Sequence, residues 1–97
     1  MATWIYVVHL TRPASLTDPT VEEASAIQYH LERLKTLCAE GVVRLAGPAL
    51  DGAFGIVILD TADEATAVSV MNEDPAVQAG VMTAELHPFH VSMERCL

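Results

Sequence analysis

The stretch Phe54-Gly55-Ile56-Val57-Ile58-Leu59 has no polar side chain at any position. In a strand, successive side chains point to opposite faces, so this stretch presents apolar groups on both faces of its sheet. The pair Asp51-Gly52 just before it is typical of tight hairpin turns. We therefore expect a strand over residues 53–60, joined through that turn to a second strand over residues 42–49.

Outward from this hairpin, two more strands are expected. Residues 3–10 are rich in β-branched and aromatic side chains, and residues 81–92 form a last strand with a break near Pro88. Residues 11–20 contain two prolines and read as a loop that is long for so small a domain. The first strand, like residues 54–59, is apolar on both sides.

Helix signals lie between the strands. The segment Thr20-Val21-Glu22-Glu23 is a capping-box pattern, and Gly41 ends the helix that starts there. A second capping pattern at residues 61–64 opens a helix to about residue 72, and Asp74-Pro75 begins a short helical turn that Gly80 ends. The order β-α-β-β-α-β predicts an α+β, ferredoxin-like fold: a four-stranded antiparallel sheet with both helices on one face.

The first helix carries an apolar stripe, whose spacings of three and four predict its buried side. His30 falls at the edge of this stripe and Cys38 within it, so we expect Cys38 to be a small core residue. The stripe consists of Ala24, Ile27, Leu31, Leu34 and Cys38.

Composition limits where this apolar surface can be hidden. The 97 residues predict one domain over the whole chain, yet 52% are hydrophobic and the mean hydropathy is +0.34. No apolar run approaches the roughly 20 residues of a spanning helix, and no signal peptide is recognised. The apolar sheet faces therefore predict a homodimer packed face to face through its sheets.

Charge and cysteine content narrow the partners and the compartment. The net charge of −8 argues against nucleic acid and anionic membranes, which attract basic patches. Two cysteines, Cys38 and an exposed Cys96 near the end, are too few for a disulfide framework. These features favour the reducing cytoplasm.

His30 and Asp74 are the candidate catalytic residues. A histidine transfers protons readily near neutral pH, and a carboxylate on one ring nitrogen fixes the tautomer and stabilises the charged ring. Each residue also has a structural explanation: His30 as a half-buried helix histidine, and Asp74 as the N-cap before Pro75. No serine or cysteine lies in a nucleophile motif, so covalent catalysis is not expected.

Five further residues are candidate substrate contacts. Tyr6 offers a hydroxyl, although a core aromatic with a satisfied hydroxyl is the more common arrangement. Arg12 is the best-placed cation for a carboxylate substrate among only five lysines and arginines. Gly47 and Pro48 mark a strand kink or a pocket wall, and Phe54 completes the set.

Metal and cofactor sites are not expected. Four histidines are present, at positions 9, 30, 87 and 90, but none lies at helical i, i+4 spacing with another. The chain also has no glycine-rich phosphate loop and no dinucleotide fingerprint. We therefore expect neither a metal nor a cofactor.

The order and spacing of several segments resemble the YciI-like, or YCII-related, proteins of the dimeric α+β barrel superfamily. The resemblance implies small cytoplasmic dimers with a histidine–aspartate pair, here His30 and Asp74, and relatives that act on cyclic or halogenated aromatic compounds. Some members carry a serine after the glycine of the third strand, where this chain has Ile56, which removes one polar substrate contact. The segments that carry the resemblance are His30-Leu31, Glu40-Gly41, Ala46-Gly47-Pro48, Asp74-Pro75 and Ala79-Gly80-Val81, with Thr11-Arg12-Pro13 matching one subgroup.

Three functions remain open from the sequence. The first is an acid–base enzyme without a cofactor, of lyase, isomerase or dehydrochlorinase type, acting on a small cyclic or aromatic acid. The alternative is a non-catalytic module that binds a small ligand in an apolar pocket. A cofactor-free oxygenase rests on fold analogy alone.

Overall fold

The secondary-structure elements follow the expected order along the chain. The computed structural model describes residues 1–95. Within them, no helix has both the length and the apolar character needed to cross a membrane. The elements are β1 (Ala2–Leu10), the 3₁₀ turn η1 (Pro13–Leu16), α1 (Val21–Ala39), β2 (Val43–Pro48), β3 (Gly55–Thr61), α2 (Glu64–Asn72), α3 (Pro75–Gln78) and β4 (Met82–Pro88).

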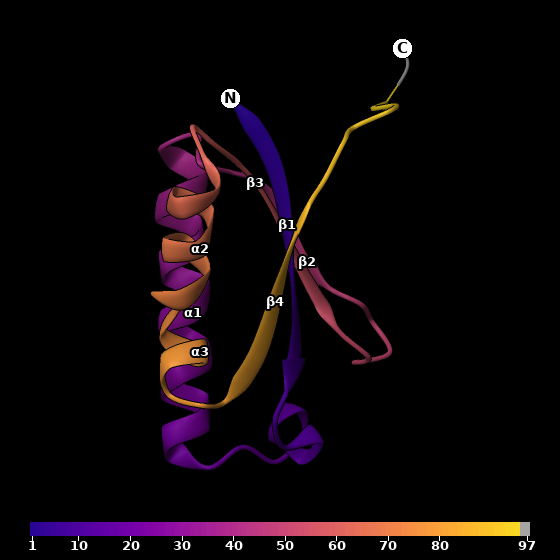
Figure 1. The fold of residues 1–97 in the computed structure, drawn as a ribbon. Helices are drawn as coiled ribbons and strands as arrows, with labels where there is room; N and C mark the ends of the chain where they lie inside the picture. Colours follow the sequence, from indigo (N-terminus) through magenta and orange to yellow (C-terminus); the bar gives the residue numbers. More distant parts are fainter. Residues whose placement is uncertain (96–97) are drawn as a thin grey trace.

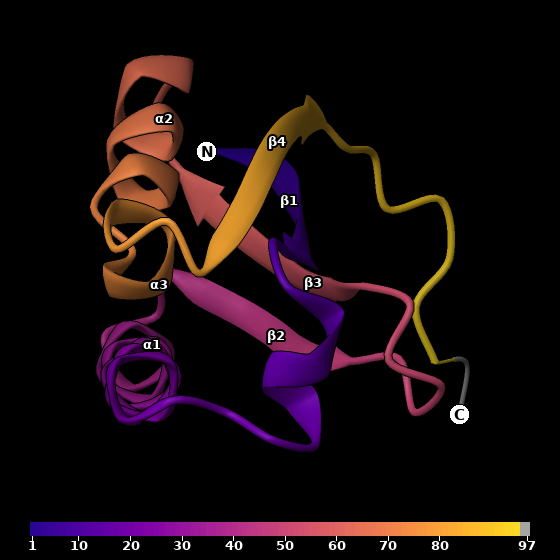
Figure 2. The same cartoon turned by 90° about the horizontal axis from the view of Figure 1, so that it is seen from below.

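The four strands form one antiparallel sheet in the order β2-β3-β1-β4. This order, with the helices on a single face, is the ferredoxin-like arrangement that the sequence predicts. Figures 1 and 2 show α1, α2 and α3 on one side of the sheet, whereas the β2–β3 turn and the segment after β4 lie toward the other side. The two faces are called the helix face and the open face below.

Local signals place the helix ends. Thr20 and Glu23 form the expected reciprocal capping box at the start of α1, and Gly41 follows its end with φ +81°. Asp74 is the N-cap of α3, with Pro75 at the first helical position. The cap of α2 differs from the expectation, because Asp63 rather than Thr61 accepts the hydrogen bond from the Thr66 amide.

The core lies between the helix face and the three helices. Alternation along β1 and β3 directs Tyr6, Val8, Val57 and Leu59 toward the helices, and all four are buried. The rest of the main cluster comes from the facing elements: Leu34 of α1, Val43 of β2, and Ala67 and Val70 of α2.

The buried side of α1 is rotated from the predicted stripe. Ala26, His30 and Leu34 are the buried residues of the helix, whereas Leu31 is 48% exposed and Cys38 is exposed. The expectation that Cys38 is a core residue was therefore wrong, and His30 lies at the centre of the buried side. The rotation follows from the buried polar partner of His30, described below. Cys96 lies outside the described residues.

The open face is apolar only in part. Ile5, Val7 and Ile56 point away from the helices and are half-buried, and Ile58 beside them is buried. On β4, however, the residues paired with Ile5 and Val7 are the polar His87 and Glu85, and Thr83 farther along the strand is also polar. The apolar surface expected on both sides of the sheet thus covers β1, β3 and β2, and it ends at the β4 edge.

The rotated face of α1 can be tested with two identical substitutions on the same helix. Leu34→Ala removes a buried side chain and should lower the free energy of unfolding by about 2–5 kcal/mol. Leu31→Ala should cost less than about 1 kcal/mol, because Leu31 is largely exposed. Urea unfolding measures both. Equal losses would contradict the placement of this helix.

Candidate active site

Asp74 lies where α2 gives way to α3, and its carboxylate is buried, with 1% exposure. Pro75 fixes the first residue of α3, and the backbone N–H of Ala76 donates to Asp74 Oδ1 at 3.0 Å. The carboxylate therefore caps α3 while it faces the interior. One role does not exclude the other, because a carboxylate accepts several hydrogen bonds.

The structure brings His30 against this carboxylate. His30 Nδ1 lies 2.7 Å from Asp74 Oδ2 and 2.9 Å from Oδ1, and the histidine is only 6% exposed. The two residues are 44 positions apart in the sequence. The contact joins the middle of α1 to the start of α3.

Tyr6 is the third member of this group. It points from the centre of β1 toward the helices, is fully buried at 0% exposure, and donates its hydroxyl to Asp74 Oδ2 at 2.8 Å. In this position the hydroxyl contacts the carboxylate and is not directed to solvent. Tyr6, His30 and the Ala76 amide thus approach Asp74 from three different elements.

The protonation states follow from these contacts. Burial pushes the pKa of Asp74 upward, but hydrogen bonds from His30, Tyr6 and the Ala76 amide, with the charge of His30, outweigh it, so the net pKa is lowered. Burial and then the Asp74 charge raise the pKa of Tyr6 far above its usual range. At neutral pH Asp74 is therefore ionised and Tyr6 is a neutral donor.

This arrangement makes the two nitrogens of His30 unequal. An ionised carboxylate only accepts hydrogen bonds, so in the neutral ring the proton lies on Nδ1 and the lone pair on Nε2. Within residues 1–95 no group forms a hydrogen bond with Nε2, and Nε2 keeps some contact with solvent. Nε2 is thus the free acid–base position of the ring.

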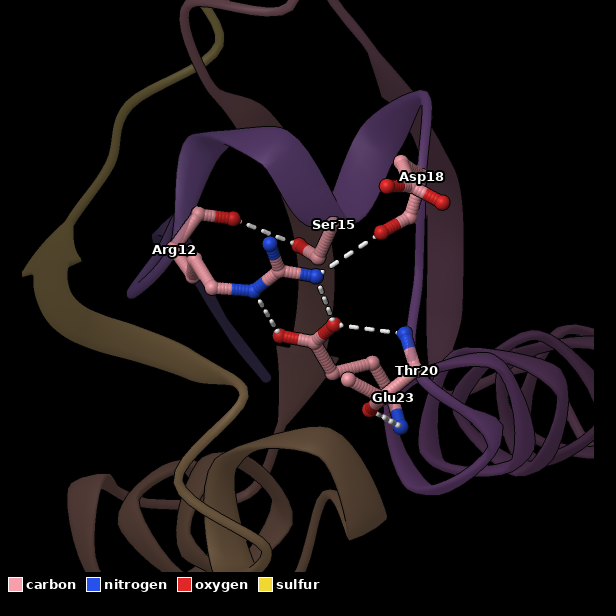
Figure 3. Close-up of polar contacts among 5 residues, drawn as sticks. All are labelled: Arg12, Ser15, Asp18, Thr20 and Glu23. Carbon is pink, nitrogen blue, oxygen red and sulfur yellow. Dashed lines mark hydrogen bonds and ion pairs between the residues drawn. The ribbon is translucent and has the colours of Figure 1, made fainter.

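Arg12 is already paired. Figure 3 shows its guanidinium facing Glu23 at the start of α1, with a further bond to the Asp18 carbonyl oxygen at 2.8 Å. The Arg12 hydrogen bond and then the Thr20 amide lower the pKa of Glu23 to about 2. Arg12 therefore fastens the loop before α1 to the capping box, and the structure does not bring it to His30.

Gly47, Pro48 and Phe54 come together, but away from His30. They line a surface hollow with Leu45 and Ile56, near the β2–β3 turn. Gly47 pairs with Ile56, which points away from the helices, so this hollow belongs to the open face. Neither this hollow nor another at the start of β1 is lined by His30, Asp74 or Tyr6.

One residue beside the His30–Asp74 pair was not identified as a candidate from the sequence. Arg33 follows His30 by one helical turn, is half-buried, and donates from Nη1 to the Val70 carbonyl oxygen of α2 at 2.8 Å. The spacing of three from His30 was the available signal. Within residues 1–95 no three histidine, cysteine or acidic side chains are grouped to hold a metal ion.

The buried carboxylate predicts an acid-sensitive stability term. The pKa of Asp74 is lower in the folded protein than its unfolded value near 4, so the folded protein binds fewer protons in this range. The contribution is complete above about pH 5 and is lost as the pH falls through the folded pKa. Asp74→Asn should cost about 1.5–3 kcal/mol near neutral pH, and the difference from wild type should shrink below about pH 4. Urea unfolding at a series of pH values measures it.

Two variants control this experiment. Tyr6→Phe keeps the buried ring but removes one donor to Asp74, so the folded pKa of Asp74 moves closer to the unfolded value, and the acid-induced loss should be smaller and end at a higher pH than in wild type. Asp18→Asn changes an exposed carboxylate and should follow the wild-type curve. If Asp74→Asn and wild type lost stability in parallel with falling pH, the inferred ionisation of Asp74 would be wrong.

Comparisons with known proteins agree with this architecture. One similar solved structure is the 5-chloro-2-hydroxyhydroquinone dehydrochlorinase of Burkholderia phenoliruptrix AC1100 in complex with 2,5-dihydroxybenzoquinone. It shares 20% identity, covering 90% of this chain and 93% of that one with a TM-score of 0.66, and this likeness shows the fold alone. No curated protein matches the sequence. The family model for the YCII-related domain matches residues 3–90, and the chain therefore belongs to the YCII-related domain family.

Proposed function

We propose that the chain is an acid–base enzyme that uses no cofactor and acts on a small cyclic or aromatic acid. The observation that carries this proposal is the asymmetry of His30. Its Nδ1 is held by a buried, ionised carboxylate, while its Nε2 has no partner within residues 1–95. Such a ring is fixed in orientation and has one nitrogen left for proton transfer.

In the proposed reaction, Nε2 removes a proton from the substrate, and Asp74 stabilises the imidazolium that forms. The electron pair of the broken bond forms a new double bond. In an elimination a leaving group such as chloride departs, and in an isomerisation the proton returns at another atom. The substrate loses HCl in the elimination and keeps its composition in the isomerisation. Neither step needs an oxidant or a reductant. The solved relative is named for dehydrochlorination of a hydroxyhydroquinone, which supports the elimination type.

Tyr6 enters the proposed mechanism through Asp74. Its hydroxyl donates to the carboxylate and helps to keep it ionised, so we assign it a positioning role in place of a contact with substrate. Asp74 in turn acts through His30. Only His30 is proposed to touch the reacting atoms.

We also propose that the working form is a homodimer through the open face. Ile5, Val7 and Ile56 form an apolar row there, and the hollow of Gly47, Pro48 and Phe54 continues it toward the β2–β3 turn. Association would remove this surface from water. In the dimer we assign the hollow to contacts with the second copy.

The proton-transfer role is tested on a panel of small cyclic and aromatic acids, together with chlorinated hydroxyhydroquinones. Wild type should accelerate deuterium exchange, or chloride release, for at least one compound. His30→Gln should lower that rate by about 10²–10⁴-fold while leaving the fold intact. Proton NMR in deuterated buffer and chloride measurement give the rates. Tyr29→Phe, at an exposed neighbour on α1, is the matched control.

Two results would contradict the enzyme. Full activity of His30→Gln would remove His30 from the reaction. Ligand binding by wild type with no turnover on any compound would favour the non-catalytic binding module.

The dimer is tested by placing a charge in the apolar row. Val7→Lys should convert the protein to a monomer, because the lysine would be buried without a partner in the interface. Leu31→Lys puts the same charge on an exposed position of α1 and should leave the dimer unchanged. Size-exclusion chromatography with light scattering measures the mass. A wild-type protein that is monomeric at micromolar concentration would contradict this assembly.

A further inference from the structure

Cations are scarce in this chain, and two of them form ion pairs with acidic side chains. It has five lysines and arginines against thirteen acids. Arg12 pairs with Glu23, and Arg44 pairs with Asp60 and Glu94. Within residues 1–95, Arg33 is a half-buried cation that forms no ion pair with a carboxylate, and its one hydrogen bond goes to the Val70 carbonyl oxygen. In a protein of net charge −8, an arginine without a carboxylate partner is unexpected.

The contacts of α1 with α2 and α3 place Arg33 beside the His30–Asp74 pair. Helix α1 runs antiparallel to α2, as Figure 1 shows. His30 contacts Asp74, and one turn later Arg33 contacts Val70, which precedes Asp74 by four residues. Side chains three apart on a helix are neighbours on its surface, with about 5–6 Å between their Cβ atoms. The two contacts therefore follow one another along the same interface, between α1 and residues 70–74.

The charge of Arg33 also acts on the Tyr6 hydroxyl. Burial and Asp74 raise the pKa of Tyr6, and the charge of Arg33 acts in the opposite direction on that hydroxyl. Tyr6 donates to the carboxylate that holds His30. The positive charge of Arg33 thus acts on the residues that surround Asp74.

The bond to Val70 uses one of the five N–H groups of the guanidinium. That bond alone would make Arg33 a cap on the last carbonyls of α2. It also fixes the side chain against α2 and leaves the remaining donors without a protein partner within residues 1–95. A pre-positioned fork of parallel donors fits a carboxylate in two-point contact.

We propose that Arg33 binds the carboxylate of the acid whose proton His30 exchanges, so that the site takes small aromatic or cyclic monocarboxylates. This assignment rests on the proposed function for the place of the reacting atom. It replaces Arg12, whose guanidinium is engaged by Glu23. The carboxylate sits against the α1–α2 contact, and the ring extends toward His30 Nε2.

Benzoate is the probe, and benzamide is its neutral counterpart of similar shape. NMR titration of wild type should show benzoate binding, with shifts at His30 and Arg33, and much weaker binding of benzamide. Arg33→Gln should weaken benzoate binding tenfold or more. Lys35→Gln removes one positive charge from an exposed position of the same helix and should leave binding within twofold. Arg33→Lys keeps the charge without the fork and should weaken binding several-fold, which decides the question if Arg33→Gln does not fold.

Several results would overturn the assignment: no benzoate binding by wild type up to tens of millimolar, equal binding by wild type and the Arg33 variants, or equal losses for Arg33→Gln and Lys35→Gln. His30→Gln separates this inference from the enzyme proposal. If benzoate binding survives in His30→Gln and depends on Arg33, the carboxylate site stands even when no compound turns over. If turnover depends on His30 but benzoate binding is independent of Arg33, only the assignment of Arg33 fails.

Discussion

The buried carboxylate of Asp74 governs how α1, α3 and β1 pack around it. An ionised group with 1% exposure is tolerated only when its oxygens are satisfied, because an unpaired buried charge costs several kcal/mol. The satisfaction comes from three elements: β1 supplies the Tyr6 hydroxyl, α1 supplies His30, and α3 supplies the Ala76 amide. The rotation of α1 follows from this requirement, and strand alternation already directs Tyr6 toward the carboxylate.

The same constraint divides structural from chemical roles among the polar residues. The Asp74 carboxylate is hydrogen-bonded to the Tyr6 hydroxyl and to His30. The role of Tyr6 and Asp74 is therefore to orient the His30 ring. The exposed ion pairs hold chain segments together, since Arg12 with Glu23 fastens the long loop to α1, and Arg44 with Asp60 joins β2 to β3. With those cations engaged, we assign the proposed recognition of an acidic ligand to Arg33, which stands one turn from His30.

Features set by neighbouring residues were predictable from the sequence, whereas the buried face of α1 and the pairing of Arg12, which depend on other parts of the chain, were not. The capping box of Thr20 and Glu23 and the Asp74-Pro75 start of α3 depend on residues at most three apart, and they were confirmed. The buried face of α1 was not, because apolar counting favours Leu31 over His30, whereas a polar partner 44 residues away decides the orientation. The pairing of Arg12 was not predicted for a related reason: Glu23 serves the helix cap and the arginine together, and the pattern showed only the cap.

The separation in sequence of the contacts around Asp74 has a consequence for the folding reaction. His30 and Tyr6 lie 44 and 68 residues from Asp74, so the loops they close span a large part of the 97-residue chain. Contacts of such span pay their closure entropy before they gain energy, which delays them relative to local turns and helices. A chain emerging from synthesis therefore holds a capped α1 well before it holds an oriented imidazole, and the His30–Asp74 pair forms only when the last third of the chain docks.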